Sequence, residues 1–110
     1  MQPADVVIGV DIGTTSVKAV VFGLDAAAHG EGQRRFELHS PAPGREELTA
    51  AAVVDGTVAA IRDAAAAARD DGLTVAGIAL SCAMHSLVAL DAAGEPITQA
   101  LTWADSRASE

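Results

Sequence analysis

A polar, glycine-centred segment between two short apolar runs is the feature of this sequence that most constrains its fold. Val6–Val10 and Val17–Phe22 are rich in β-branched residues, which is the pattern of buried strands. The segment between them, Asp11–Ser16, has the sequence Asp-Ile-Gly-Thr-Thr-Ser and is typical of a turn. Because the connection is so short, we expect the two strands to pair antiparallel as a hairpin.

A third strand and a long helix are predicted to follow. Gly30–His39 is a more polar strand candidate that completes an antiparallel meander. Residues Glu46–Asp71 then change to a helical period, with Glu46 and Glu47 in the first turn, where acidic groups suit the helix dipole, and Gly72 as the C-terminal cap. The apolar side chains that recur at spacings of three or four are Leu48, Ala51, Val54, Val58, Ile61, Ala65 and Ala68.

The second half of the chain contains further strand candidates. Val75–Ser81 is apolar enough to be buried on both faces, and it is expected to run parallel to the first strand because a helix precedes it. Leu87–Leu90 is a short strand candidate, turned by Asp91–Gly94, and Pro96–Trp103 contains a last extended segment. The element order therefore predicts an α/β fold with a mixed sheet.

Length, charge and cysteine content narrow the function classes. A chain of 110 residues suffices for one small domain, and its formal net charge of -8 disfavours nucleic acid and anionic membranes as partners. The single cysteine, Cys82, allows no internal disulfide and fits a cytoplasmic location. No apolar run approaches the roughly 20 residues of a membrane-spanning helix, and no signal peptide is recognisable.

The turn between the first two strands carries residue types suited to phosphate. Gly13 can adopt a positive φ and let a phosphate approach the backbone, while Thr14, Thr15 and Ser16 offer hydroxyl and N–H donors. Asp11, at the end of a strand, is placed to hold Mg²⁺ directly or through water, and Lys18 can add a positive charge. The spacing is not that of a Walker loop, and the structural alternative is an ordinary hairpin turn rich in Gly and Thr.

A second group of candidate residues lies downstream, in Met84-His85-Ser86 and in Trp103-Ala104-Asp105-Ser106-Arg107. His85 and Asp105 can exchange hydrogen bonds with hydroxyls, Trp103 can pack on a carbon skeleton, and Arg107 can pair with a carboxylate or instead brace Asp105. The structural alternatives are that Met84 and Trp103 fill a core and that Asp105 and Arg107 form a surface ion pair.

Together these motifs resemble those of a known family. The strand–DxGTT–strand–strand–helix–strand order resembles the nucleotide-binding half-domain of the actin, heat-shock chaperone and sugar kinase superfamily. Met84-His85 and the Trp-x-Asp-x-Arg pattern of Trp103–Arg107 are similar to those of the FGGY carbohydrate kinases. Met-His-Ser with Trp-Ala-Asp looks most like gluconate kinases. Xylulose kinases usually have Met-His-Gly and Trp-Asn-Asp, and glycerol kinases have Arg-Glu in place of Met-His.

The resemblance implies a fold, an activity and a site. The fold is the actin-like ATPase (ribonuclease H-like) fold, with residues 1–110 as a partial N-terminal lobe that contains a mixed sheet and a long helix. The activity is transfer of phosphate from ATP, with Mg²⁺, to a sugar or sugar acid, most readily gluconate. The resemblance places the phosphates at Asp11–Ser16 and Lys18, and the acceptor at Met84, His85, Trp103, Asp105 and Arg107.

The same resemblance implies that part of the enzyme is missing. Family members are several times longer, so their catalytic base is expected beyond Glu110, and the chain alone is expected to be an inactive fragment. The alternatives are a xylulokinase-like enzyme, a non-catalytic ATP-binding module of the same fold, and a decayed remnant that does not fold stably. Oligomeric state is not predicted by these residues.

Overall fold

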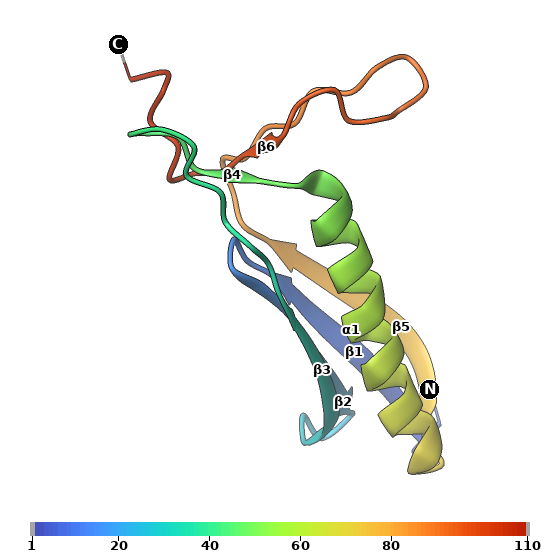
Figure 1. Ribbon diagram of the computed structural model, residues 1–110. Helices are drawn as coiled ribbons and strands as arrows, with labels where there is room; N and C mark the ends of the chain where they lie inside the picture. Colours follow the sequence, from blue (N-terminus) through green and yellow to red (C-terminus); the bar gives the residue numbers. More distant parts are fainter. Residues whose placement is uncertain (1, 110) are drawn as a thin grey trace.

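The two apolar runs that flank the glycine-centred turn form the centre of a four-stranded sheet in the computed structural model, which describes residues 2–109 (Figure 1). Strands β1 (Asp5–Ile12) and β2 (Ser16–Gly23) pair antiparallel, and β3 (Ala28–Arg35) pairs antiparallel with β2. Strand β5 (Thr74–Cys82) lies on the other side of β1 and runs parallel to it. The strand order β3-β2-β1-β5 confirms the predicted meander and the mixed sheet.

One long helix, α1 (Ala50–Asp70), crosses one face of this sheet and packs mainly on β3 and β2 (Figure 1). Small residues make the contact: a Cβ at Gly32 would collide with the carbonyl of Ala60, and one at Gly30 would lie 2.8 Å from the Cβ of Ala67. The helix therefore approaches the sheet too closely for larger side chains. The core between them consists of Val6, Ile8, Val10, Val17, Ala19, Val21, Ala60, Ala64 and Ala68.

A second, smaller sheet lies beyond the helix N-terminus. It pairs β4 (Glu47–Leu48) antiparallel with β6 (Ala100–Leu101), and single bridges attach His39 to Glu47 and Leu87 to Leu101. The loop that leads into β6 stands away from the main sheet (Figure 1). The described residues are consequently elongated, with extents of 53 × 28 × 20 Å and a radius of gyration of 16.6 Å, against about 13 Å for a compact domain of this size.

The start and the buried face of the helix differ from the prediction. Glu46 and Glu47 do not occupy a first helical turn, because the chain there is extended and pairs with β6 and its flanking residues; no acidic residue lies in the first turn of α1. Val54 and Val58, predicted to face the core, are 60% and 40% exposed. The fully buried residues of α1 are Ala60, Ala64 and Ala68, of which only Ala68 belongs to the predicted face, while Ile61 and Ala65 of that face are partly buried against the same core. The helix lies so close to the glycines of β3 that only small side chains fit between them.

The helix end matches the prediction, and a glycine within the helix permits a close contact. Gly72 follows the helix with φ = +71°, which a glycine adopts without strain, and its N–H bonds the carbonyl of Arg69. Gly56 faces the segment after β3, where an added Cβ would lie 2.8 Å from the Phe36 ring. Gly56 thus permits close packing of α1 against Phe36.

Two predictions for the second half are wrong. Strand β5 is not buried on both faces: Ile78 is 50% exposed and Leu80 is 63% exposed, because β5 is an edge of the sheet in the described part of the chain and α1 touches it little. Leu87–Leu90 forms only isolated bridges rather than a strand, whereas the extended segment predicted after Pro96 contains β6. Among residues 2–109 no helix has the length and apolarity that crossing a membrane requires.

Candidate phosphate and acceptor site

The turn between β1 and β2 is tightly held by backbone hydrogen bonds. The N–H of Gly13 donates to the carbonyl of Ser16 at 2.9 Å, and the carbonyl of Thr15 accepts from the N–H of Phe36 at 2.8 Å. Gly13 does not have a positive φ, so that part of the prediction is wrong. Glycine fits this position for a steric reason: a Cβ added at Gly13 would lie 3.3 Å from the Ser16 carbonyl oxygen, which is a tight contact.

Two threonines at the tip of this turn have unused hydrogen-bonding groups. Within residues 2–109, neither the N–H groups nor the hydroxyls of Thr14 and Thr15 have a hydrogen-bond partner. Thr15 is exposed and Thr14 is partly exposed. A rigid turn with free donors is an arrangement that can accept phosphate oxygens.

Two charged residues predicted for the site lie on the sheet face opposite the helix. Asp11 and Lys18 are direct cross-strand partners, and both are exposed. The Lys18 ammonium lies 3.2 Å from the carboxylate of Glu31 on β3, with both side chains about half exposed. The lysine is therefore engaged along the sheet, whereas the Asp11 carboxylate has no hydrogen-bond partner in the described part of the chain.

The Met-His segment is attached directly to the glycine-centred turn. The N–H of Ala83 donates to the carbonyl of Ile12 at 2.8 Å, which extends the β1–β5 pairing to the edge of the turn. The next two residues, Met84 and His85, are exposed, and His85 has φ = +59°, a left-handed conformation that is uncommon for a residue with a side chain. Such strained residues gather at functional sites.

The glycine-centred turn and the segment after β5 contribute to the wall of one cavity. It has a volume of about 300 Å³ and a mostly apolar lining that joins Gly13 and Thr14 of the turn to Cys82, Ala83 and Ser86. The start of α1 and Thr102 complete its wall. The cavity wall includes neither Met84 nor His85, but the residues on either side of them, Ala83 and Ser86, lie in it beside Gly13 and Thr14, although about 70 residues separate the two segments in the sequence.

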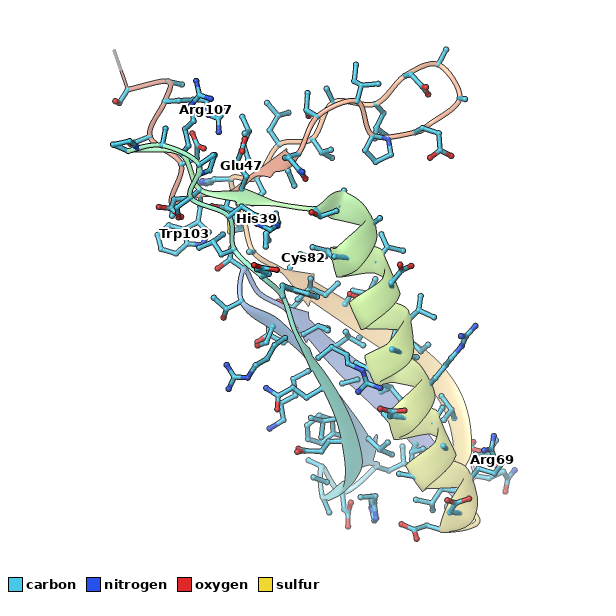
Figure 2. All side chains as sticks on the ribbon, viewed as in Figure 1. His39, Glu47, Arg69, Cys82, Trp103 and Arg107 are labelled. Atoms are coloured by element: carbon cyan, nitrogen blue, oxygen red, sulfur yellow. The ribbon has the colours of Figure 1, made fainter. Side chains whose placement is uncertain are left out.

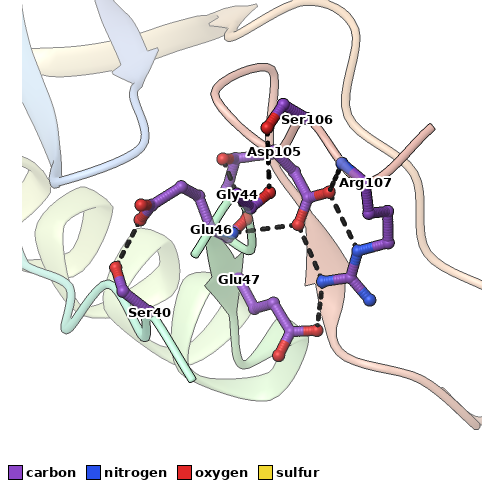
Figure 3. A network of polar contacts seen from close by, with 8 residues as sticks. Ser40, Gly44, Glu46, Glu47, Asp105, Ser106 and Arg107 are labelled. Atoms are coloured by element: carbon purple, nitrogen blue, oxygen red, sulfur yellow. Dashed lines mark hydrogen bonds and ion pairs between the residues drawn. The ribbon is translucent and has the colours of Figure 1, made fainter. Parts of the chain in front are cut away.

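The third segment, Trp103–Arg107, is fastened to the strand before the helix rather than to the glycine-centred turn (Figure 3). The Asp105 carboxylate accepts from the N–H of Glu46 at 2.9 Å and from the N–H of Arg107 at 3.1 Å. The Arg107 guanidinium donates to the same carboxylate through Nε at 2.9 Å and Nη2 at 2.7 Å. Arg107 therefore braces Asp105, which is the second of the two roles that the sequence left open for it.

The electrostatics of this pair follow from those contacts. Hydrogen bonds from the Arg107 side chain hold the pKa of Asp105 well below its usual range against the effect of desolvation, and N–H donation from Glu46 and Arg107 adds to the lowering. The hydrogen bond to Asp105, followed by the one to Glu47, raises the pKa of Arg107. Both groups are charged at neutral pH, and four protein donors surround the Asp105 carboxylate, which has about four acceptor positions.

The structure also shows residues of this region that sequence reasoning missed. Thr102 is 4% exposed and both its N–H and its hydroxyl donate to the carbonyl of Glu46 at 3.0 Å. Glu47 accepts from Arg107 Nη2 at 2.8 Å. The adjacent Glu46-Glu47 pair was a visible signal, but its position before an apolar helical period favoured a helix-dipole role. Figure 2 shows Trp103, Cys82, Glu47 and Arg107 at the same end of the molecule.

The mixed sheet with one crossing helix is a partial N-terminal lobe of the actin-like ATPase fold, and its structural neighbours are sugar kinases. The crystal structure of gluconate kinase from Lactobacillus acidophilus matches 96% of this chain with a TM-score of 0.84 and 28% identity. That of xylulose kinase from Rhodospirillum rubrum matches 93% with a TM-score of 0.87 and 29% identity. In each case the match covers 21% of the solved chain.

Sequence comparison gives the family. The model of the N-terminal domain of the FGGY family of carbohydrate kinases matches residues 6–110, so the chain belongs to this family. Glycerol kinase of Thermococcus kodakarensis is 33% identical over 104 residues, and glycerol kinase 2 of Saccharolobus solfataricus is 32% identical over 109 residues. These alignments cover 94% and 98% of this chain but 21% and 22% of the relatives, so the chain spans about a fifth of their length. Membership in the predicted family is confirmed, while the relatives differ in the acceptor that their names state.

Proposed function

We propose that this chain supplies the phosphate-binding turn and one wall of the acceptor site in an ATP-dependent carbohydrate kinase. The observation that carries the proposal is the junction at Ala83 and Ile12, where a 2.8 Å backbone hydrogen bond joins the Met84–His85 segment to the turn with free donors. A phosphate donor at Thr14 and Thr15 and a hydroxyl acceptor at His85 would thereby lie next to each other. Phosphoryl transfer depends chiefly on such positioning.

Each segment has a distinct task in this proposal. Thr14, Thr15 and Ser16 bind phosphate oxygens of ATP. Lys18, which pairs with Glu31 in this structure, adds positive charge when a phosphate replaces Glu31 as its partner. Met84, His85 and Trp103 contact the acceptor, whose hydroxyl oxygen forms the new bond to phosphorus as the bond to ADP breaks. We expect the hydroxyl proton to pass to a base outside these residues, as the family resemblance implies.

Asp11 is the residue of this chain suited to hold Mg²⁺. Its carboxylate is exposed at the end of β1 without a protein partner, and no cluster of three or more potential ligand side chains lies among the described residues. One carboxylate with water and phosphate oxygens is an ordinary Mg²⁺ environment. When bound, the ion neutralises charge on the transferred phosphate.

For the acceptor we propose gluconate, on the strength of Ser86 and Ala104. A neutral sugar or polyol is the second candidate, and a specific observation favours it. Arg107 contacts both Asp105 and Glu47, so this cluster carries net negative charge and offers little attraction to a sugar carboxylate. Xylulose and glycerol represent that candidate. A cytoplasmic location stays a prediction.

The test is acceptor-dependent ADP formation by the natural protein that carries this chain, measured with gluconate, xylulose and glycerol at equal concentrations. The expected result is the highest kcat/KM for gluconate. A preference for xylulose or glycerol would reject gluconate in favour of a neutral sugar or polyol. MgATP binding without ADP formation on any acceptor would support a non-catalytic module. The 110 residues alone, which cover about a fifth of the relatives' length, are expected to show no turnover.

A further inference from the structure

Trp103 is an exposed aromatic side chain held between two buried anchors. Its side chain is 63% exposed, while Thr102 before it is 4% exposed and the Asp105 side chain after it is also 4% exposed. Both anchors bind the backbone of a single residue: Thr102 donates to the Glu46 carbonyl, and Asp105 accepts from the Glu46 N–H at 2.9 Å. The backbone on either side of Trp103 is therefore fixed, and the ring is displayed rather than packed.

The Asp105 anchor depends on the orientation of the Arg107 guanidinium. Nε and Nη2 contact the two oxygens of the Asp105 carboxylate in a fork, a geometry that requires the guanidinium plane to be aligned with the carboxylate. Nη2 has a second partner, the Glu47 carboxylate at 2.8 Å. Glu47 thus restrains the plane from the side opposite Asp105 (Figure 3).

Glu47 is itself held firmly, which makes it a suitable anchor. Its N–H and carbonyl both bond the backbone of His39 at 2.8 Å, and on its other side β4 pairs it with Leu101 of β6. Its side chain is only 16% exposed. A carboxylate on a backbone paired from both sides has little freedom, so its contact orders Arg107 at a low cost in entropy.

We propose that Glu47 is a positioning residue. By orienting Arg107 against Asp105, it fixes residues 102–105, the segment that displays Trp103, as a preformed wall of the acceptor site. The role of this segment as a wall of the acceptor site rests on the proposed function. The effect of the Glu47 contact on the mobility of Trp103 does not. Asp105, with four protein donors on its carboxylate, then acts through Trp103 rather than as a direct ligand of the acceptor hydroxyls. Preformed aromatic walls favour binding because no ordering is required on association.

Trp103 provides its own probe, because the chain contains one Trp and no Tyr. The experiment is time-resolved fluorescence anisotropy of the isolated chain, without sugar or nucleotide, in Glu47→Ala, Glu47→Gln and Asp105→Asn variants. The matched control is Glu46→Ala, whose lost side chain contacts Ser40 rather than Arg107. All variants are compared far below their melting temperatures and with far-UV circular dichroism that matches the parent chain.

The expected result is at least a twofold increase in the anisotropy lost to fast local motion for Glu47→Ala and Asp105→Asn, with no change for Glu46→Ala. Glu47→Gln, which keeps an acceptor oxygen, should fall between, and it serves as the readout if Glu47→Ala does not fold. Equal mobility in the Glu47 and Glu46 variants would overturn the coupling. In the natural protein, Glu47→Gln should raise the acceptor KM several-fold with little change in kcat, and an unchanged KM beside a mobile Trp103 would overturn the acceptor role alone.

Discussion

The close approach of α1 to β3 yields a sharp prediction for Gly32. Replacing Gly32 with alanine directs a Cβ at the carbonyl group of Ala60, with its carbon 3.0 Å away, and at the Cβ of Asp63, 2.9 Å away. These atoms belong to the helix backbone or lie next to it, so the whole helix must move. Gly77→Ala on β5 is the matched control, because an added Cβ there meets nothing within 4 Å.

The magnitude follows from two opposing effects. Overpacking of this kind costs typically 1–3 kcal/mol, and we take about 3 kcal/mol because backbone obstructs the new methyl group. Replacing a strand glycine recovers roughly 0.5–1 kcal/mol of chain entropy. Gly32→Ala should therefore lose about 2 kcal/mol, and Gly77→Ala should gain about 0.5 kcal/mol.

Thermal unfolding followed by circular dichroism measures both variants against the parent chain. At about 4–8 °C per kcal/mol for a domain of this size, the two melting temperatures should differ by roughly 10 °C or more. Equal stability of the Gly32 and Gly77 variants would refute the tight helix–sheet contact and the account of why the helix buries alanines.

Three further predictions concern other parts of the chain. The pKa of Asp105 is lowered in the folded state, so the contribution of its carboxylate to stability is complete above the unfolded pKa of about 4 and is lost as pH falls toward the folded pKa. Between about pH 4 and pH 2 the melting temperature of the parent should therefore fall more steeply than that of Asp105→Asn. Parallel curves would contradict the pairing of Asp105 with Arg107. On α1, Val58→Gln should change the free energy of unfolding by less than about 0.5 kcal/mol, because Val58 is 40% exposed. Ala64→Gln should cost about 3 kcal/mol or more in thermal unfolding, because Ala64 is fully buried. The reverse order would support the helix face predicted from the sequence. Gly72→Ala should lose about 1 kcal/mol in urea unfolding because of the left-handed φ at this position, and Gly72→Asn should lose less. Steric hindrance does not contribute, since no atom lies within 4 Å of the added Cβ. An alanine variant as stable as the parent would contradict the role of Gly72 as the helix cap.

The elements that the sequence predicted well are those whose signals are local. The hairpin follows from two apolar runs separated by a short turn, and the parallel pairing of β5 follows from the helix before it. Gly72 is identified as a cap by its position after the last helical turn. None of these conclusions required knowledge of which distant residues would meet.

The wrong predictions for the start and the buried face of α1 arise from contacts between residues that are distant in the sequence. Glu46 and Glu47 suit a helix start by themselves, but they contact Asp105 and Arg107, which lie 59 and 60 positions away. A pairwise contact at that separation leaves no periodic trace in the sequence. The buried face of α1 was predicted only in part, because apolarity alone ranks Val54 above Ala64, although the two glycines of β3 decide which side chains fit.

In the candidate site, too, the local motifs could be predicted from the sequence and the long-range contacts could not. The motifs of the glycine-centred turn and the Met-His and Trp-x-Asp-x-Arg segments identify the family, which the match over residues 6–110 confirms. They do not show that Ala83 bonds Ile12 or that Arg107 is shared between two carboxylates. Those contacts separate residues that can reach an acceptor from residues that position others.

The central claim, that the turn after β1 serves phosphoryl transfer, is tested most directly by ADP release from the natural protein that carries this chain. Asp11→Asn removes the carboxylate proposed for Mg²⁺, and Asp55→Asn, on the exposed face of α1, is the matched control. The account predicts that acceptor-dependent ADP release falls about a hundredfold or more in Asp11→Asn and is unchanged in Asp55→Asn. Parent-like ADP release by a folded Asp11→Asn protein would contradict the account.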